Sequence, residues 1–173
     1  MTDAIAKAAQ VPNVRFIEMT STGAEKLGAE FAAIDPWARY AYSAAALTTY
    51  LGTDESDAPR FEIVVDDELA GAIGVRRSWL RGPYLQFLGI LPVFQRRGIG
   101  RVALDWFEGE ARAVQAQNLW VAASDFNTRA LAFYERSGFR RVATLDDFVV
   151  DNSAEILLRK RLTGAPLLGS ASR

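Results

Sequence analysis

The stretch YLQFLGILPVFQRRGIGRVALDWF, residues 84–107, decides the fold, because it reads as a strand, a glycine-rich loop and a helix. Its first part, Tyr84–Leu91, is a short apolar run that contains one polar residue, Gln86, and ends at Pro92. Such a run is typical of a strand in the middle of a sheet. The helix is predicted to begin after Gly98, with one apolar stripe facing the sheet: Ala103, Phe107, Ala111 and Val114.

The loop between this strand and helix carries both glycines and arginines. Gly98 and Gly100 let a ligand approach the backbone closely, and the first turn of a helix offers N–H groups that have no partner within the helix. The helix dipole and the side chains of Arg96, Arg97 and Arg101 add positive charge. The loop therefore predicts a binding site for an anionic, phosphorylated ligand.

This loop resembles the Gln/Arg-x-x-Gly-x-Gly/Ala signature of the GNAT superfamily, the acyl-CoA N-acyltransferases, from Gln95 to Gly100. Alone, its glycines also fit the loose dinucleotide-binding fingerprint of an oxidoreductase, and a solvated, arginine-rich loop can simply cap a helix. A nicotinamide-binding unit usually opens its domain, whereas this loop lies in the middle of the chain. The loop by itself leaves these alternatives open.

A second motif lies in the next strand-to-helix unit, in the order that the superfamily has. The stretch NTRALAFYERSGF, residues 127–139, is similar to the second GNAT signature, N-x-x-A-x-x-x-Y-x-x-x-G-F. Asn127 also predicts a helix N-cap, and Gly138 predicts the left-handed residue that ends the helix. Two motifs in the expected order are far more specific than either one alone.

The resemblance implies an α/β fold, the GNAT acyl-CoA N-acyltransferase fold: a mixed, mostly antiparallel sheet of six to seven strands flanked by helices on both faces. Strands are expected over residues 14–19, 61–65, 69–75, 84–91, 119–123, 140–145 and 155–162, and helices over 24–34, up to 51 from a cap at Ser43, after Gly98, and over 128–137. Residues 76–83 are expected to form a connection. The domain is expected to span 13–163, with an N-terminal extension, 1–12, and a flexible C-terminal tail, 164–173.

Composition limits the chemistry, because the chain has no Cys and no His. Disulfides, thiolate or imidazole metal sites, cysteine nucleophiles and Ser-His-Asp triads are therefore excluded, and no metal cofactor is expected. The net charge of −1 argues against non-specific binding to nucleic acid or a membrane surface. Without an apolar run long enough for a membrane span or a signal-peptide pattern, we expect a cytoplasmic enzyme. The superfamily also allows a homodimer.

The resemblance implies acetyl-CoA as the acyl donor and assigns roles to residues of both motifs. The cofactor-binding residues would be Leu88, Ile90, Leu91, Arg96, Arg97, Gly98, Gly100, Arg101, Asn127 and Tyr134. Tyr134 would protonate the CoA thiolate as general acid, unless it is only a core residue at the helix end, and the Ile90 N–H would stabilise the oxyanion. Gly89 would mark a bulge where the strand ends separate.

The general base is where the sequence departs from many members of the superfamily. They carry a glutamate on the fourth or fifth strand, whereas this chain has Gln86 in the central strand and no carboxylate along residues 119–123. A water chain or a flanking acid is left as the base: Asp35, Asp146, Asp147 or Asp151. The missing carboxylate also motivates an alternative, a catalytically silent acyl-CoA-binding regulatory domain.

The acceptor is expected to be a primary amine, carried by a small molecule or by a protein or peptide N-terminus. Trp37, Tyr40, Tyr42 and Tyr50 follow the first predicted helix, in the region that borders the superfamily's acceptor site. Aromatic residues at this density also pack cores and helix junctions. If they do line the site, these aromatics and the acidic connection 146–152 favour a cationic acceptor.

Overall fold

The structure, a computed structural model, describes residues 13–162, so the predicted extension 1–12 and tail 164–173 lie outside the described residues. The elements are β1 (Val14–Glu18), α1 (Ser21–Phe31), α2 (Ala44–Gly52), β2 (Arg60–Val65), β3 (Glu68–Trp79), β4 (Gly82–Ile90), the short 3-10 helix η1 (Pro92–Phe94), α3 (Ile99–Ala113), β5 (Asn118–Ser124), α4 (Thr128–Arg136), β6 (Arg140–Asp146) and β7 (Ala154–Arg161). Within this part of the chain, no helix has the length and apolar character needed to cross a membrane.

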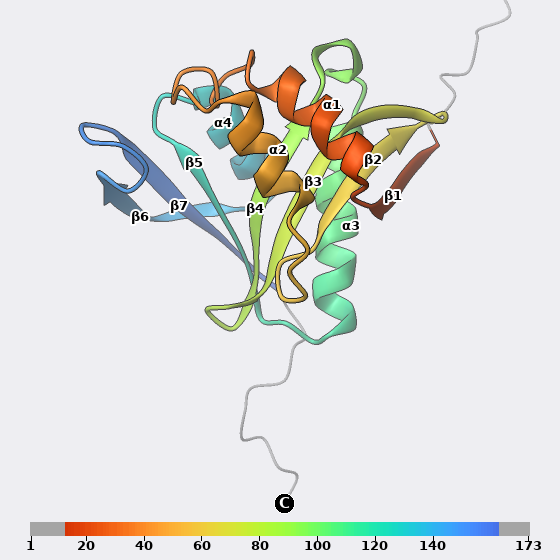
Figure 1. Cartoon of the computed structure of the whole chain (residues 1–173). Coiled ribbons are helices and arrows are strands. Elements are labelled where there is room, and N and C mark those ends of the chain that lie inside the picture. The colour runs from red at the N-terminus through yellow and green to blue at the C-terminus, as the bar shows by residue number, and fades with distance from the viewer. Residues whose placement is uncertain (1–12, 163–173) are drawn as a thin grey trace, which may run out of the picture.

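Among residues 13–162, seven strands form one sheet in the order β1-β2-β3-β4-β5-β7-β6. Neighbouring strands run antiparallel, except that β4 and β5 are parallel. Helices α1 and α2 pack on one face of the sheet, and α3 and α4 pack on the other (Figure 1). The predicted mixed, mostly antiparallel sheet with helices on both faces is therefore confirmed.

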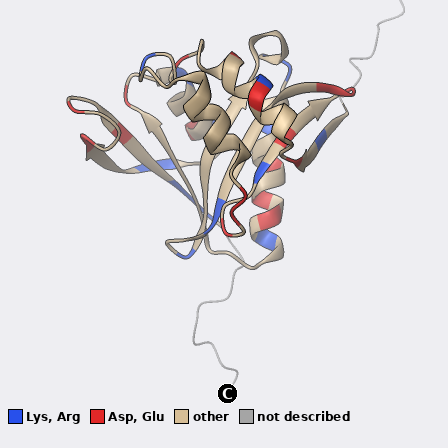
Figure 2. Cartoon of the chain, in the orientation of Figure 1, with Lys and Arg blue, Asp and Glu red and all other residues tan. Residues whose placement is uncertain are grey.

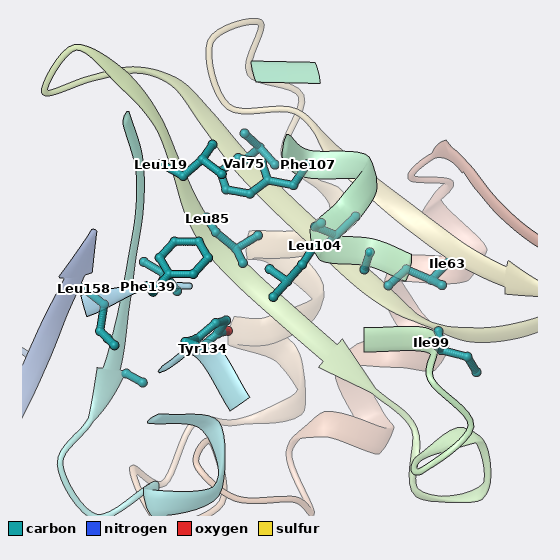
Figure 3. Packing of buried hydrophobic residues seen from close by; sticks show 14 of the residues in the cluster. Ile63, Val75, Leu85, Ile99, Leu104, Phe107, Leu119, Tyr134, Phe139 and Leu158 are labelled. Atoms are coloured by element: carbon teal, nitrogen blue, oxygen red, sulfur yellow. The ribbon is translucent and has the colours of Figure 1, made fainter. Parts of the chain in front are cut away.

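The larger core lies between the sheet and α3. Ala103, Phe107 and Ala111 are buried there, as the helical spacing predicted, and Phe107 packs beside Val75 of β3 (Figure 3). Val114 was predicted to continue the stripe, but its side chain is 74% exposed. The helix ends at Ala113, so Val114 is its C-cap residue and lies beyond the last helical turn, where solvent reaches the side chain.

Local signals fix both ends of α4. The side chain of Asn127 accepts a hydrogen bond from the backbone N–H of Ala130 at 3.1 Å, which confirms the predicted N-cap. At the other end Gly138 has a φ of +92°, and the N–H of Phe139 donates to the carbonyl of Tyr134 at 3.1 Å. These bonds close the helix with a glycine-dependent ending and hold Tyr134 in the last turn.

The strands β4 and β5 pair only at Tyr84 and Leu85 and then separate (Figure 1). At the same place the register between β3 and β4 shifts by one residue, which leaves Gln86 without a partner on β3. The bulge therefore lies at Gln86. The prediction that Gly89 marks the bulge was wrong, because Gly89 pairs regularly with Ala72. Glycine is needed there for another reason: a Cβ atom would lie 2.6 Å from Cζ of the Phe31 ring.

Residues 76–83 were predicted to form a connection, and this prediction was wrong. They extend the β3–β4 hairpin instead. The extension is held by acidic side chains of the loop between α2 and β2. Arg76 Nη2 lies 2.9 Å from Glu55 Oε1, and the hydroxyl of Ser78 donates to Asp57 Oδ1 at 2.6 Å. These partners lie far away in sequence, so the local pattern does not reveal the extension.

Two glycine substitutions test the packing of the sheet against a matched control. A Cβ atom at Gly71 would lie 2.1 Å from the backbone oxygen of Gly89, so Gly71→Ala should force β3 and β4 apart. We expect it to lower the free energy of unfolding by about 3 kcal/mol. Gly109→Ala, in the exposed middle of α3 with no atom within 4 Å, should raise it by about 1 kcal/mol. Urea unfolding measures both; equal changes would contradict this packing.

Candidate active site

Two hollows meet where β4 and β5 separate. We call the first the groove: it has a volume of about 410 Å³ and runs along the end of β4, the arginine-rich loop and α4. We call the second the pocket: it has a volume of about 220 Å³ and lies between β4, β5, the segment after α1 and the β6–β7 loop. Four residues line both hollows: Leu88, Asn127, Ala130 and Tyr134.

The loop at the start of α3 gives one end of the groove the features expected of an anion-binding site. Gly98 precedes the helix with a φ of +78°, and nothing lies within 4 Å of the place where its Cβ atom would be. Within residues 13–162, the backbone N–H groups of Gly98, Ile99 and Gly100 have no hydrogen-bond acceptor. Arg96 and Arg101 also line the groove, so unpaired donors and positive charge gather at one end of it.

The side chain of Gln95 links the two walls of the groove. Its Nε2 donates to the carbonyl of Ile90 on β4 at 2.9 Å, and its Oε1 accepts from Arg129 of α4 at 3.3 Å. The N–H of Leu91 donates to the carbonyl of Ala70 at 2.8 Å, so the backbone N–H of Leu91 points towards β3. Because residues alternate along an antiparallel ladder, the N–H groups of Leu88 and Ile90 face the groove instead.

Tyr134 lies at the junction of the groove and the pocket. Only 7% of it is exposed, and its ring packs edge-on against Phe139 with 5.9 Å between ring centroids (Figure 3). Burial and, secondly, the neighbouring Tyr84 raise the pKa of Tyr134 well above its usual value. The hydroxyl is therefore protonated at neutral pH and can donate a proton. Tyr134 is thus a core residue that also lines both hollows.

The groove brings together most of the predicted cofactor-binding residues: Leu88, Ile90, Arg96, Gly98, Gly100, Arg101, Asn127 and Tyr134. Leu91 and Arg97 are not among the residues that line it. The backbone N–H of Leu91 is already bonded to Ala70, and the guanidinium of Arg97 lies over the Phe94 ring, 5.4 Å from its centroid.

The aromatic cluster after α1 divides between the pocket and the core. Trp37, Tyr40 and Tyr42 line the pocket, together with Tyr84. Tyr50 does not line it: its ring lies 5.7 Å from that of Phe87 and beneath the guanidinium of Arg60. The core interpretation is therefore confirmed for Tyr50, whereas the acceptor-site interpretation of the pocket-lining aromatics stays a prediction.

The pocket also contains a carboxylate that the sequence pattern did not single out, Glu155 of β7. It is 8% exposed, and its Oε1 accepts a hydrogen bond from the Tyr40 hydroxyl at 2.7 Å. The four flanking acids lie elsewhere: Asp35 lines the groove, Asp151 lines a separate hollow, and neither Asp146 nor Asp147 lines the pocket. Glu155 stands at the start of a predicted strand, where an acid is ordinarily solvated. The only sequence signal for Glu155 was its position directly before the apolar run 156–158.

Burial of Tyr84 makes stability depend on pH at the alkaline end. Burial and the charge of Glu155 raise the pKa of Tyr84 to about 12, compared with about 10 in an unfolded chain. The unfolded chain therefore releases its proton first, so stability is full below pH 10 and falls as the pH rises towards 12, by up to about 1.4 kcal/mol per pH unit. In Tyr84→Phe, the free energy of unfolding should fall less steeply over this range. Urea unfolding of both proteins between pH 8 and 12 measures this pH dependence. The same decrease in the free energy of unfolding for the wild type and the variant would contradict the prediction.

Comparison with known proteins places this chain in a family. Residues 24–139 match the family model described as the acetyltransferase (GNAT) family. Over 91 residues the chain is 30% identical to the [ribosomal protein bS18]-alanine N-acetyltransferase of Salmonella typhimurium, a match that covers 53% of this chain and 61% of that protein, less than two thirds of its length.

Solved structures share the fold. The ribosomal-protein-S18-alanine N-acetyltransferase of Escherichia coli superposes with a TM-score of 0.71 at 17% identity, over 94% of this chain and 99% of that one. Arabidopsis thaliana NAA60, in complex with a bisubstrate analogue, superposes with a TM-score of 0.67 at 17% identity, over 87% of this chain and 99% of that one. With the family match over residues 24–139, the chain belongs to the acetyltransferase (GNAT) family.

Proposed function

We propose that the protein is an N-acetyltransferase that moves an acetyl group from acetyl-CoA directly to a primary amine. The observation that carries this proposal is the meeting of the groove and the pocket at Tyr134. The groove has an anion-binding end for a pyrophosphate, and the pocket has room for an acceptor. The two substrates would thus meet at a protonated hydroxyl.

The groove residues suit the parts of acetyl-CoA in order. The free N–H groups of Gly98, Ile99 and Gly100 would bind the pyrophosphate, with Arg96 and Arg101 supplying charge. The N–H group of Leu88 would then pair with the pantetheine arm in the manner of an added strand. The N–H group of Ile90 would bind the oxygen of the acetyl carbonyl, which becomes the oxyanion. The acetyl group would lie at the junction beside Tyr134.

The chemistry needs no covalent enzyme intermediate. The neutral amine attacks the thioester carbonyl, a C–N bond forms, and the N–H of Ile90 stabilises the oxyanion. The C–S bond then breaks and the CoA thiolate takes the proton of Tyr134, which is replaced as the nitrogen loses a proton. Overall, an ammonium group and acetyl-CoA give an acetamide, CoA thiol and one proton.

The acceptor is an amine of a small molecule or of a protein or peptide N-terminus. The Salmonella relative is named for the alanine of ribosomal protein bS18, which supports a protein acceptor. A ribosomal acceptor and a chain without a membrane-spanning helix among residues 13–162 support a cytoplasmic location.

Ligand-dependent melting and CoA release test the proposal together. Acetyl-CoA at 100 times its dissociation constant should stabilise the protein by about 2.7 kcal/mol, whereas NAD(P) should not change its melting temperature. CoA release should exceed background hydrolysis with at least one class of amine among polyamines, amino acids, aminoglycosides and peptides. Stabilisation by NAD(P) alone would favour the oxidoreductase, and binding without turnover would favour the silent acyl-CoA-binding domain.

A further inference from the structure

Glu155 is the carboxylate that lines the pocket. The other buried carboxylate among residues 13–162, Glu62, does not line it and accepts at Oε1 from the backbone N–H and the hydroxyl of Thr20. The half-buried Glu108 is paired with Lys160 and Arg112. Glu155 forms no ion pair with any residue between 13 and 162, and its only hydrogen bond in that range reaches Oε1. Its second oxygen, Oε2, is therefore available to a ligand.

The surroundings of Glu155 favour a cation in the pocket. A buried carboxylate is costly unless a positive charge or several hydrogen bonds compensate for it. No Lys or Arg is among the residues that line the pocket, whereas the aromatic rings of Trp37, Tyr40 and Tyr84 are. Aromatic faces attract cations as well. The charge that would complete this site must come from the ligand.

A second acceptor in the pocket is also unpaired. Oε1 of Gln86, the bulge residue of β4, is buried without a hydrogen-bond partner in the described chain. The β6–β7 loop, which contributes Phe148 and Val149 to the pocket wall, carries acidic side chains (Figure 2). The pocket thus offers free acceptor oxygens under a negative rim, which fits a ligand that is both cationic and rich in N–H donors.

We propose that Glu155 binds the protonated acceptor amine and is the general base of the reaction, an inference that rests on the proposed acetyl transfer. The carboxylate takes one proton from the ammonium group, which gives the neutral amine and a carboxylic acid. The amine nitrogen then attacks the thioester carbon, and Glu155 returns its proton to solvent after the C–S bond breaks. The substrate class is a primary amine that is cationic at neutral pH.

The same inference gives Tyr40 a positioning role, because its hydroxyl donates a hydrogen bond to the carboxylate of Glu155. Its hydroxyl lies 2.7 Å from Glu155 Oε1 and 3.0 Å from the hydroxyl oxygen of Ser153. Tyr40 comes from the segment after α1, so it ties the carboxylate to the aromatic wall through Oε1 and leaves Oε2 for a ligand.

Glu155→Gln tests the base directly, because glutamine keeps the volume and can still accept from Tyr40. We expect kcat/KM for the best amine at pH 7 to fall about 100-fold or more, with an unchanged Kd for acetyl-CoA. In the variant, kcat/KM should rise about tenfold per pH unit towards the amine pKa of about 10, whereas the wild-type profile should level off earlier.

The pH profile isolates Glu155 because the other groups facing the pocket are tyrosines: Tyr40, Tyr42, Tyr84 and Tyr134. Burial raises the pKa of Tyr40, Tyr84 and Tyr134, so they stay protonated between pH 6 and 9. The neighbouring hollow adds Arg39, Asp125 and Asp151. Asp125→Asn is the matched control, since it removes a charge from the neighbouring hollow without touching the pocket or the acidic β6–β7 loop, and it should change kcat/KM by less than about twofold.

Glu155→Asp keeps the carboxylate on a shorter side chain and should lose less activity than Glu155→Gln while keeping the wild-type pH profile. A Glu155→Gln variant with kcat/KM within about threefold of wild type and the same pH profile would overturn the assignment. So would a larger effect from Asp125→Asn than from Glu155→Gln. If the wild-type protein binds acetyl-CoA but acetylates no amine, the proposed function itself fails, and the assignment of Glu155 fails with it.

Discussion

Tyr134→Phe is expected to lower kcat by about 100-fold to 1,000-fold and to leave the Kd for acetyl-CoA within about threefold. The substitution removes only the hydroxyl, so the ring still packs against Phe139 and α4 keeps its ending. Without that proton donor, the CoA thiolate must leave unprotonated from a buried site. Release of CoA thiol at saturating substrates measures kcat, and calorimetry measures the Kd.

Tyr50→Phe is the matched control for this substitution. The hydroxyl of Tyr50 is also buried, but it has no hydrogen-bond partner among the described residues and lines neither the groove nor the pocket. Its removal should leave kcat within about twofold, because no reacting atom lies beside it. Equal losses in the two variants would show that Tyr134 acts through packing alone and would remove it from the acid role.

Gly98→Ala is expected to weaken acetyl-CoA binding about 30-fold, which corresponds to about 2 kcal/mol. The new Cβ atom would occupy the open space over the free N–H groups of the loop, where the pyrophosphate is proposed to lie. An increase in KM for acetyl-CoA, with a smaller change in kcat, is the kinetic form of the same result. Calorimetric titration with acetyl-CoA measures the affinity without turnover.

Alanine at a positive φ also strains the backbone, so the control must carry the same strain. Gly138→Ala meets this need, because Gly138 has a φ of +92° but ends α4 away from the groove. It should lower the melting temperature as Gly98→Ala does, while the Kd for acetyl-CoA stays within about threefold. An unchanged Kd in Gly98→Ala would mean that the phosphates bind elsewhere.

The parts of the fold that the sequence predicts well are those set by neighbouring residues. Asn127 and Gly138 lie at the two ends of α4, and their roles depend on bonds within the same turn. The conformation of the arginine-rich loop is also set by neighbouring residues, because Gly98 takes its left-handed conformation directly before the helix begins. Local hydrogen bonding and backbone sterics suffice for these predictions.

The features that the sequence does not predict depend on residues far apart in the chain. The small size of Gly89 is required by the Phe31 ring, and the β3–β4 extension depends on Glu55. The clearest case is Glu155, which becomes a pocket residue because β7 pairs with β5 and Tyr40 bonds to it. No local pattern distinguishes such an acid from a solvated one at a strand end.

Transfer of a ¹³C-acetyl label from acetyl-CoA to nitrogen tests the central claim most directly. The chain of residues 1–173 would be incubated with labelled acetyl-CoA and a cationic primary amine, and the products followed by NMR. Direct transfer predicts an acetamide carbon signal that grows in a one-to-one ratio with CoA thiol. Labelled acetate without acetamide for every amine tested, despite binding of acetyl-CoA, would contradict acetyl transfer to an amine.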